Sequence, residues 1–139
     1  MKEMKLILTI VVGVILFVSN QLFAQQQIIV HIKKIPSDKG VVRVGLYNKA
    51  NFRLQSLQSA VGKITDGRSA VVFKNVNPGE YAVLCYQDAN ENQKMDFLPN
   101  GMPLENYGGS NNSMSYGPPR YENAKFTVAD KNIVLEVRL

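Results

Sequence analysis

The feature that most constrains this chain is a series of short apolar segments, separated by turn residues, that begins after residue 27. Residues 28–35 are rich in β-branched side chains, and the turn-forming sequence PSDKG follows them. The next segment, VVRVGLY at residues 41–47, alternates two sets of side chains with the period of a β-strand. We therefore expect two strands here, joined as a hairpin.

The same pattern continues toward the end of the chain. A turn at Asp66-Gly67 interrupts the apolar residues 64–73, and the sequence NPGE at residues 77–80 precedes a segment that is apolar on both faces. Such a segment is typical of a central strand covered on both sides. Residues 124–128 and 133–137 are expected to form a closing hairpin. Only residues 48–61 have a spacing closer to that of a short helix, which predicts a partly helical crossover.

About seven short strands with little helix predict an all-β fold. We expect an antiparallel β-sandwich of the transthyretin-like or immunoglobulin-like kind. The 115 residues from 25 to 139 suit a single domain and are enough to bury one core.

The first 24 residues have the order of a secretory signal peptide. Lys2 and Lys5 precede an uncharged apolar run at residues 6–18, and Leu-Phe-Ala at residues 22–24 supplies a small residue for cleavage after Ala24. The alternative is an uncleaved membrane anchor, but the run of 13 residues is shorter than the roughly 20 that a spanning helix needs. We therefore expect a secreted or periplasmic product without stable membrane insertion.

Charge and cysteine content exclude several classes of function. The chain has 16 basic and 11 acidic residues, and removing the leader leaves 14 and 10, a balance of +4. The basic residues are scattered rather than gathered in a stripe, so nucleic-acid binding is not expected. Cys85 is the only cysteine and lies within an apolar strand segment, where it is predicted to be a small buried hydrophobe rather than a nucleophile.

Oxygen-bearing side chains recur at alternate positions where the central strand ends. The candidate metal ligands are Asp88, Asn90, Asn92, Lys94 (through its carbonyl) and Asp96. This is the early spacing of an EF-hand loop, but Gln93 occupies the position of the usual glycine and Pro99 that of the bidentate glutamate. Two interpretations stay open: a weak calcium site with a Kd of roughly 0.1–1 mM, or an Asx-rich turn whose side chains bond their own backbone.

Residues 105–122 form a long segment rich in tyrosine, asparagine and glycine, a composition typical of adaptable binding surfaces. The predicted surface consists of Glu105, Tyr107, Asn111, Asn112, Tyr116, Arg120 and Tyr121. Aromatic faces flanked by amides suit a sugar. The alternative is that the tyrosines only hold a long loop against the edge of the sandwich.

An ordered set of motifs resembles the bacterial family known as domain of unknown function 2141. The motifs are KGVVRVGLY at 39–47, NPGEYAV at 77–83, DANENQKMD at 88–96, ENYG at 105–108, SNN at 110–112 and GPPRYENAKF at 117–126. The resemblance implies an exported β-sandwich similar to transthyretin-like and carboxypeptidase regulatory-like domains, with no assigned activity or catalytic residues. Members of the family commonly have glycine at the position of Gln93 and an aromatic residue at that of Gly109.

Together these observations predict a secreted or periplasmic, non-enzymatic β-sandwich that serves as a binding or accessory module. Its partner is expected to be an unidentified protein or glycan of the cell envelope. One alternative is an envelope hydrolase that acts on glycans, with Asp88, Asp96 and Glu105 in its cleft and two carboxyls about 5–10 Å apart. Another is a structural component of the envelope, which would self-associate without binding a ligand.

Overall fold

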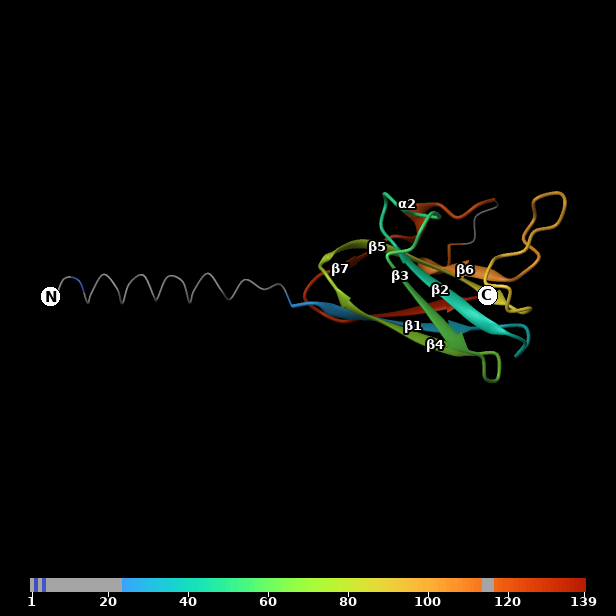
Figure 1. The fold of residues 1–139 in the computed structure, drawn as a ribbon, viewed down its shortest axis with the longest axis horizontal. Coiled ribbons are helices and arrows are strands. Elements are labelled where there is room, and N and C mark those ends of the chain that lie inside the picture. Colours follow the sequence, from blue (N-terminus) through green and yellow to red (C-terminus); the bar gives the residue numbers. More distant parts are fainter. Residues whose placement is uncertain (1, 3, 5–23, 114–116) are drawn as a thin grey trace.

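The structure is a computed structural model that describes residues 2, 4, 24–113 and 117–139. Two β-sheets pack face to face (Figure 1). The smaller sheet has the order β4-β1-β8, and the larger has the order β3-β2-β5-β6, with β7 paired to the start of β5. The strands are β1 (Gln26–Lys33), β2 (Val41–Tyr47), β3 (Gln58–Lys63), β4 (Ser69–Val76), β5 (Gly79–Asp88), β6 (Tyr107–Gly109), β7 (Phe126–Val128) and β8 (Ile133–Arg138). A 3-10 turn η1 (Ser110–Asn112) and the short helix α2 (Tyr121–Ala124) follow β6. The predicted all-β class with two facing sheets is confirmed.

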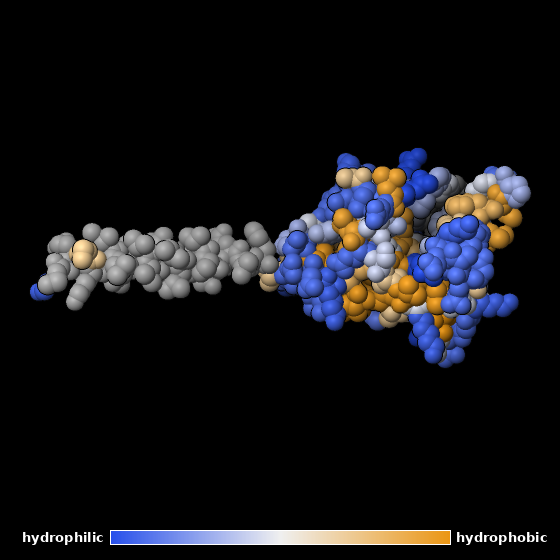
Figure 2. Space-filling model, viewed as in Figure 1, coloured by the Kyte–Doolittle hydropathy of each residue, from blue (hydrophilic) through white to orange (hydrophobic). Residues whose placement is uncertain are grey.

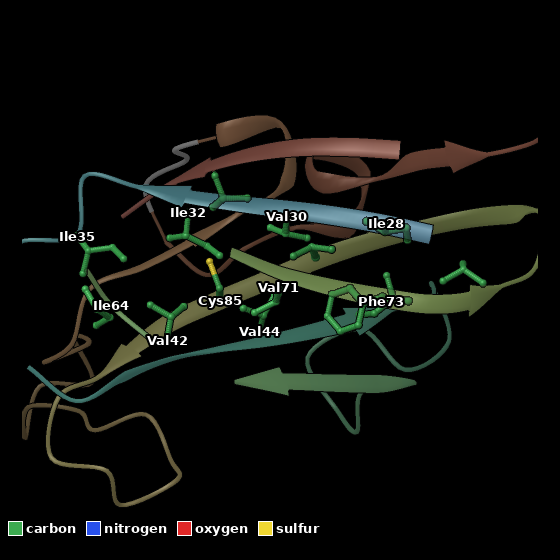
Figure 3. Close-up of a cluster of buried hydrophobic side chains, with 14 of the residues drawn as sticks. Ile28, Val30, Ile32, Ile35, Val42, Val44, Ile64, Val71, Phe73 and Cys85 are labelled. Atoms are coloured by element: carbon green, nitrogen blue, oxygen red, sulfur yellow. The ribbon is translucent and has the colours of Figure 1, made fainter. Parts of the chain in front are cut away.

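The hydrophobic core lies between the two sheets (Figure 3). Ile28, Val30 and Ile32 of β1 are fully buried, whereas His31 between them is exposed. Opposite them, alternate residues of β2 and β5 point inward, including Cys85, which is buried as predicted. This alternation places one face of each sheet in the core and turns the other face outward.

Both predicted hairpins are wrong. β1 pairs with β4 and β8, while β2 pairs with β3 and β5, so the connection between β1 and β2 crosses from one sheet to the other. Likewise, β7 pairs with β5 in the larger sheet and β8 pairs with β1 in the smaller one. A short turn between two apolar segments is compatible with either arrangement, and here consecutive strands face each other across the core.

One strand pair also departs from the predicted antiparallel arrangement. β1 and β8 run parallel, with Ile28 opposite Ile133 and Lys33 opposite Arg138. The other described pairs between named strands are antiparallel. The period of two in a sequence identifies a strand but does not fix its direction.

The predicted partly helical crossover at residues 48–61 is replaced by a turn and a strand. Asn48 and Asn51 each accept a hydrogen bond from the backbone N–H of the other, at 3.0 and 2.8 Å, which closes a tight turn. Phe52 then packs edge-on against Tyr47 and Tyr121, and β3 begins at Gln58. The apparent helical spacing therefore reflects packing of Phe52 rather than a continuous apolar face, because Leu54 is exposed.

The predicted leader lies outside the described residues, apart from residues 2, 4 and 24. Within the described part of the chain, no helix has both the length and the apolar character needed to cross a membrane.

A candidate binding groove on the larger sheet

A groove of about 820 Å³ lies on the outer face of the larger sheet. Its floor consists of residues whose neighbours along each strand point into the core. The floor residues are Arg43, Gly45 and Tyr47 of β2, Ser59 and Val61 of β3, Leu84 and Tyr86 of β5, and Tyr107 of β6. The groove therefore depends on the same alternation that builds the core.

Strand register explains the shape of this groove. Arg43 lies opposite Val61 on one side and Tyr86 on the other, and Tyr86 lies opposite Tyr107, so large side chains form one row across four strands. The next row passes through Gly45, which lies between Ser59 and Leu84. Because Gly45 has no side chain, the ring of Tyr47 lies over it and forms this part of the groove floor.

One wall of the groove is a projecting loop, residues 96–104, which we call the apolar finger. Backbone hydrogen bonds from Leu104 to Asp96 and from Leu98 to Met102, 2.9 and 2.8 Å long, hold it as a narrow two-stranded loop (Figure 1, orange loop at the upper right). Its exposed apolar side chains are Phe97, Leu98, Met102 and Leu104. Figure 2 shows a hydrophobic projection at this position, next to hydrophilic surface. Exposed apolar side chains gathered in this way are typical of interaction sites.

The opposite edge of the groove is formed by Arg53 and Ser56, which follow β2, and by residues 117–119. Tyr47 lies near this edge, and its pKa is raised by burial. Among the described residues that line the groove, two are arginines and none is an aspartate or a glutamate.

Arg43 is fixed on the groove floor by a buried carboxylate. Its Nε donates a 2.6 Å hydrogen bond to Oδ2 of Asp88, whose side chain is fully buried, while Arg43 keeps 25% of its side-chain surface exposed. Asp88 also accepts backbone hydrogen bonds from Gln93 at 2.9 Å and from Asn92 at 3.2 Å. The loop after β5 thus closes over Asp88 and holds it beside Arg43.

The ionisation of this pair follows from its contacts. Burial alone would raise the pKa of Asp88, but the hydrogen bond and charge of Arg43, together with the N–H groups of Gln93 and Asn92, hold that pKa below its ordinary value. The hydrogen bond to Asp88 in turn raises the pKa of Arg43. Both groups are therefore charged near neutral pH.

Of the predicted calcium ligands, Asp88 is bonded to Arg43, and the side chains of Asn90, Asn92 and Asp96 are bonded to one another on the loop that follows. Nδ2 of Asn90 and Nδ2 of Asn92 each donate a 2.8 Å hydrogen bond to Asp96, and Lys94 N–H donates to Asn92 at 3.1 Å. These are the contacts of an Asx-rich turn. In the described part of the chain, no three His, Cys, Asp or Glu side chains are grouped as metal ligands. Calcium binding stays a prediction, and a cation here would compete with Arg43 for Asp88.

The structure separates the residues of the predicted binding surface. Tyr107 lies on the groove floor, and Tyr116 lies outside the described residues. Arg120 is exposed directly before α2, while Tyr121 is buried against Phe52.

The two asparagines of this surface connect parts of the fold. Nδ2 of Asn111 donates to the carbonyl oxygens of Asn123 and Lys125, at 3.1 and 2.9 Å. Asn112 donates to the carbonyl of Glu136 at 2.9 Å and accepts from the N–H of Arg138 at 2.8 Å. Such contacts agree with the alternative interpretation of residues 105–122, in which this long segment is held against the edge of the sandwich. In both cases a side-chain amide satisfies backbone groups of a neighbouring segment.

Glu105 is half-buried outside the groove. Its Oε2 atom is buried without a hydrogen-bond partner among the described residues. Burial raises the pKa of Glu105, and the charges of Asp96 and Asp88 raise it further. These three carboxyls belong to the loop region behind the groove wall and do not line the groove.

Sequence reasoning missed most of the groove residues, including Arg43, Tyr47, Tyr86, Phe97 and Met102. A signal for Arg43 and Tyr47 was present, because strict alternation in VVRVGLY places both on the face opposite Val42 and Val44. The finger gave no comparable signal, since its apolar residues have neither the helical nor the strand period.

The fold and groove define a two-sheet β-sandwich protein with an aromatic, arginine-containing groove on the outer face of one sheet. A family model described as "Uncharacterized protein conserved in bacteria" (DUF2141) matches residues 30–136. The chain belongs to this family, as its motifs predict. Neither the curated proteins nor the solved structures contain a match to the chain.

Proposed function

We propose that this protein is an exported, non-enzymatic binding module that holds a glycan chain of the cell envelope in the outer groove. The observation that carries the proposal is the groove itself, an open cavity of about 820 Å³ with Tyr47, Tyr86 and Tyr107 along its floor. Tyrosine rings combine rigid apolar area with a polar end, which suits the faces and hydroxyl groups of a sugar. Ser56, Ser59 and Asn100 add hydroxyl and amide groups around the groove.

Export is proposed from the order of basic, apolar and small residues in positions 1–24. The position of the first strand supports this proposal, because β1 begins at Gln26, two residues after the expected cleavage site. We propose that residues 25–139 act as one domain in the periplasm or outside the cell.

The absence of carboxylates from the described lining of the groove supports a binding role over glycan hydrolysis. A glycosidase of the common kind needs two carboxyls that flank the bond to be cleaved. Asp88 is instead buried beneath the loop that follows β5 and is paired with Arg43. Cys85, a further candidate nucleophile, is buried, and its pKa is raised to about 12 by burial.

The apolar finger favours a second candidate, in which the partner is a protein of the envelope. Phe97, Met102 and Leu104 are all exposed on one narrow loop, and apolar side chains of this kind are common in the centres of protein interfaces. Phe97 and Met102 also line the groove, so a protein and a glycan would compete for the same surface.

A glycan array probed with the purified protein tests the proposal. We expect binding to a limited set of envelope-type glycans, and we expect Tyr107→Ala and Tyr86→Ala each to weaken it by about tenfold, or about 1.4 kcal/mol. His31→Ala is a matched control, because His31 is an exposed ring on the smaller sheet. Binding that is equally strong in the tyrosine variants would place the ligand elsewhere. Self-association without any ligand would favour the structural alternative.

A further inference from the structure

Arg43 occupies a central position on the groove floor. It lies on β2, an inner strand of the larger sheet, in the row that continues through Tyr86 to Tyr107. A ligand that stacks on these two rings therefore passes beside the guanidinium group.

Within the described part of the chain, one contact, made through Nε, holds the guanidinium. Its Nε atom is bonded to Asp88, and Asp88 is itself fixed by the backbone N–H groups of Gln93 and Asn92. Among the described residues, no group accepts a hydrogen bond from the Nη atoms of Arg43. An arginine that is immobilised through Nε and keeps its Nη groups free is ready to bind a planar, doubly accepting group.

The charges of the groove favour a single negative charge on the ligand. Arg43 and Arg53 both line the groove, and the described lining contains no carboxylate. Asp88, which lies behind Arg43, neutralises one of the two positive charges. One carboxylate from the ligand would neutralise the other, whereas a doubly charged phosphate would leave an excess of negative charge.

From these observations, and resting on the proposed glycan-binding function, we propose that the groove recognises an acidic glycan, with Arg43 binding the carboxylate of a hexuronic acid whose ring lies against Tyr86 and Tyr107. Asp88 is then a positioning residue, because it orients Arg43 and does not itself line the groove. The backbone N–H groups of Asn92 and Gln93 hold Asp88 in place.

The test compares two matched ligands on protein expressed from the full-length sequence and purified as the host processes it. The ligands are oligogalacturonate and its methyl ester, which has the same sugar rings but no charge. In calorimetric titrations we expect the acid to bind at least about tenfold more tightly than the ester. This is the difference expected when one charge-assisted hydrogen bond, here between the ligand carboxylate and Arg43, is lost. We also expect the acid, but not the ester, to shift the side-chain N–H resonances of Arg43 in NMR spectra.

Variants test whether the preference for the acid comes from the guanidinium of Arg43 or from the overall positive charge of the groove. Arg43→Gln alone leaves Asp88 buried without its partner, so the double variant Arg43→Gln/Asp88→Asn is included to remove both charges together. We expect the double variant to lose most of the preference for the acid over the ester and to keep only the smaller part that Arg53 contributes. Arg43→Lys, which keeps the charge but not the planar fork, should lose most of the preference, and Arg53→Gln should lose less.

Each outcome of the titrations has a defined meaning. Equal binding of acid and ester by the wild-type protein would overturn the inference and leave the proposed glycan-binding function standing. Binding of neither ligand, combined with an empty glycan array, would overturn both. Equal affinity for an unrelated peptide with a free terminal carboxylate would overturn the assignment to a sugar. A preference for the acid that is undiminished in the double variant would show that Arg43 is not the anchor.

Discussion

The aromatic ring of Tyr47 lies over Gly45, two residues earlier on the same face of β2. A methyl group added to Gly45 would lie 2.8 Å from the ring and hydroxyl atoms of Tyr47. The absence of a side chain at residue 45 therefore leaves the space that the tyrosine ring occupies on the groove floor.

Gly45→Ala should displace Tyr47 without unfolding the protein. The contacts that a methyl group would make are with the far end of a flexible side chain, so we expect the melting temperature to change little. Tyrosine fluorescence and crystallography would detect the moved ring, and glycan binding should weaken. Unchanged binding in a well-folded variant would show that Tyr47 does not contribute to the groove.

Arg43→Ala should destabilise the protein strongly, because it leaves Asp88 buried and unpaired. We expect a loss of about 3 kcal/mol in the free energy of unfolding, at the lower end of the range for buried pairs since Arg43 is partly exposed. The matched control is Glu136→Gln, which breaks the equally short 2.6 Å pair between Lys33 and Glu136 on the surface. That variant should have a much smaller effect. Similar losses in urea denaturation would contradict a special role for the buried pair.

Asp88 should make the stability of the protein sensitive to acid. Its pKa in the folded protein is lowered from the ordinary value of 3.8, so the ionised form stabilises the fold above that value. This contribution is lost as the pH falls through the lower, folded-state pKa. Below about pH 4, the wild-type protein should therefore lose stability more steeply than Asp88→Asn, although the variant is the less stable of the two at pH 7. Parallel curves of stability against pH would count against this assignment.

Calcium should not raise the melting temperature of the protein. The carboxylate of Asp88, the first predicted ligand, is bonded to Arg43 and to two backbone N–H groups. Differential scanning calorimetry with millimolar calcium, and then with a chelator, provides the measurement. A rise in melting temperature that Asp96→Asn abolishes would instead establish the calcium site that the sequence spacing predicts.

The thiol of Cys85 should be inert in the folded protein. The residue is buried, and its pKa is raised to about 12 by burial, so almost no thiolate exists at pH 8. We expect a thiol reagent to modify it only after denaturant is added. Rapid modification of the native protein would show that the segment around Cys85 opens in solution.

Sequence reasoning identified most strands because a period of two is a local property. It identified the central β5 and the buried Cys85 for the same reason. It failed where the answer depends on distant partners: nothing near residues 36–40 shows that β2 pairs with β5 rather than with β1. The prediction of a partly helical crossover at residues 48–61 was wrong because two asparagines close a turn there through their side chains.

The candidate site was predictable only in part. Tyr107 was identified from composition, and Arg43 belonged to a recognisable strand face. The pairing of Arg43 with Asp88 joins residues 45 positions apart, so no spacing rule could find it. As a result, the loop whose sequence spacing resembles a calcium site instead holds Asp88 in place beside Arg43.

The parallel pairing of β1 with β8 has a consequence for how the domain folds. β1 occupies the middle of the smaller sheet, yet one of its two neighbours is contributed by residues 133–138, close to the far end of the chain. The smaller sheet therefore cannot be completed until residues 133–138 reach β1, so its assembly depends on a contact between segments far apart in the sequence and is expected to be a slow step of folding.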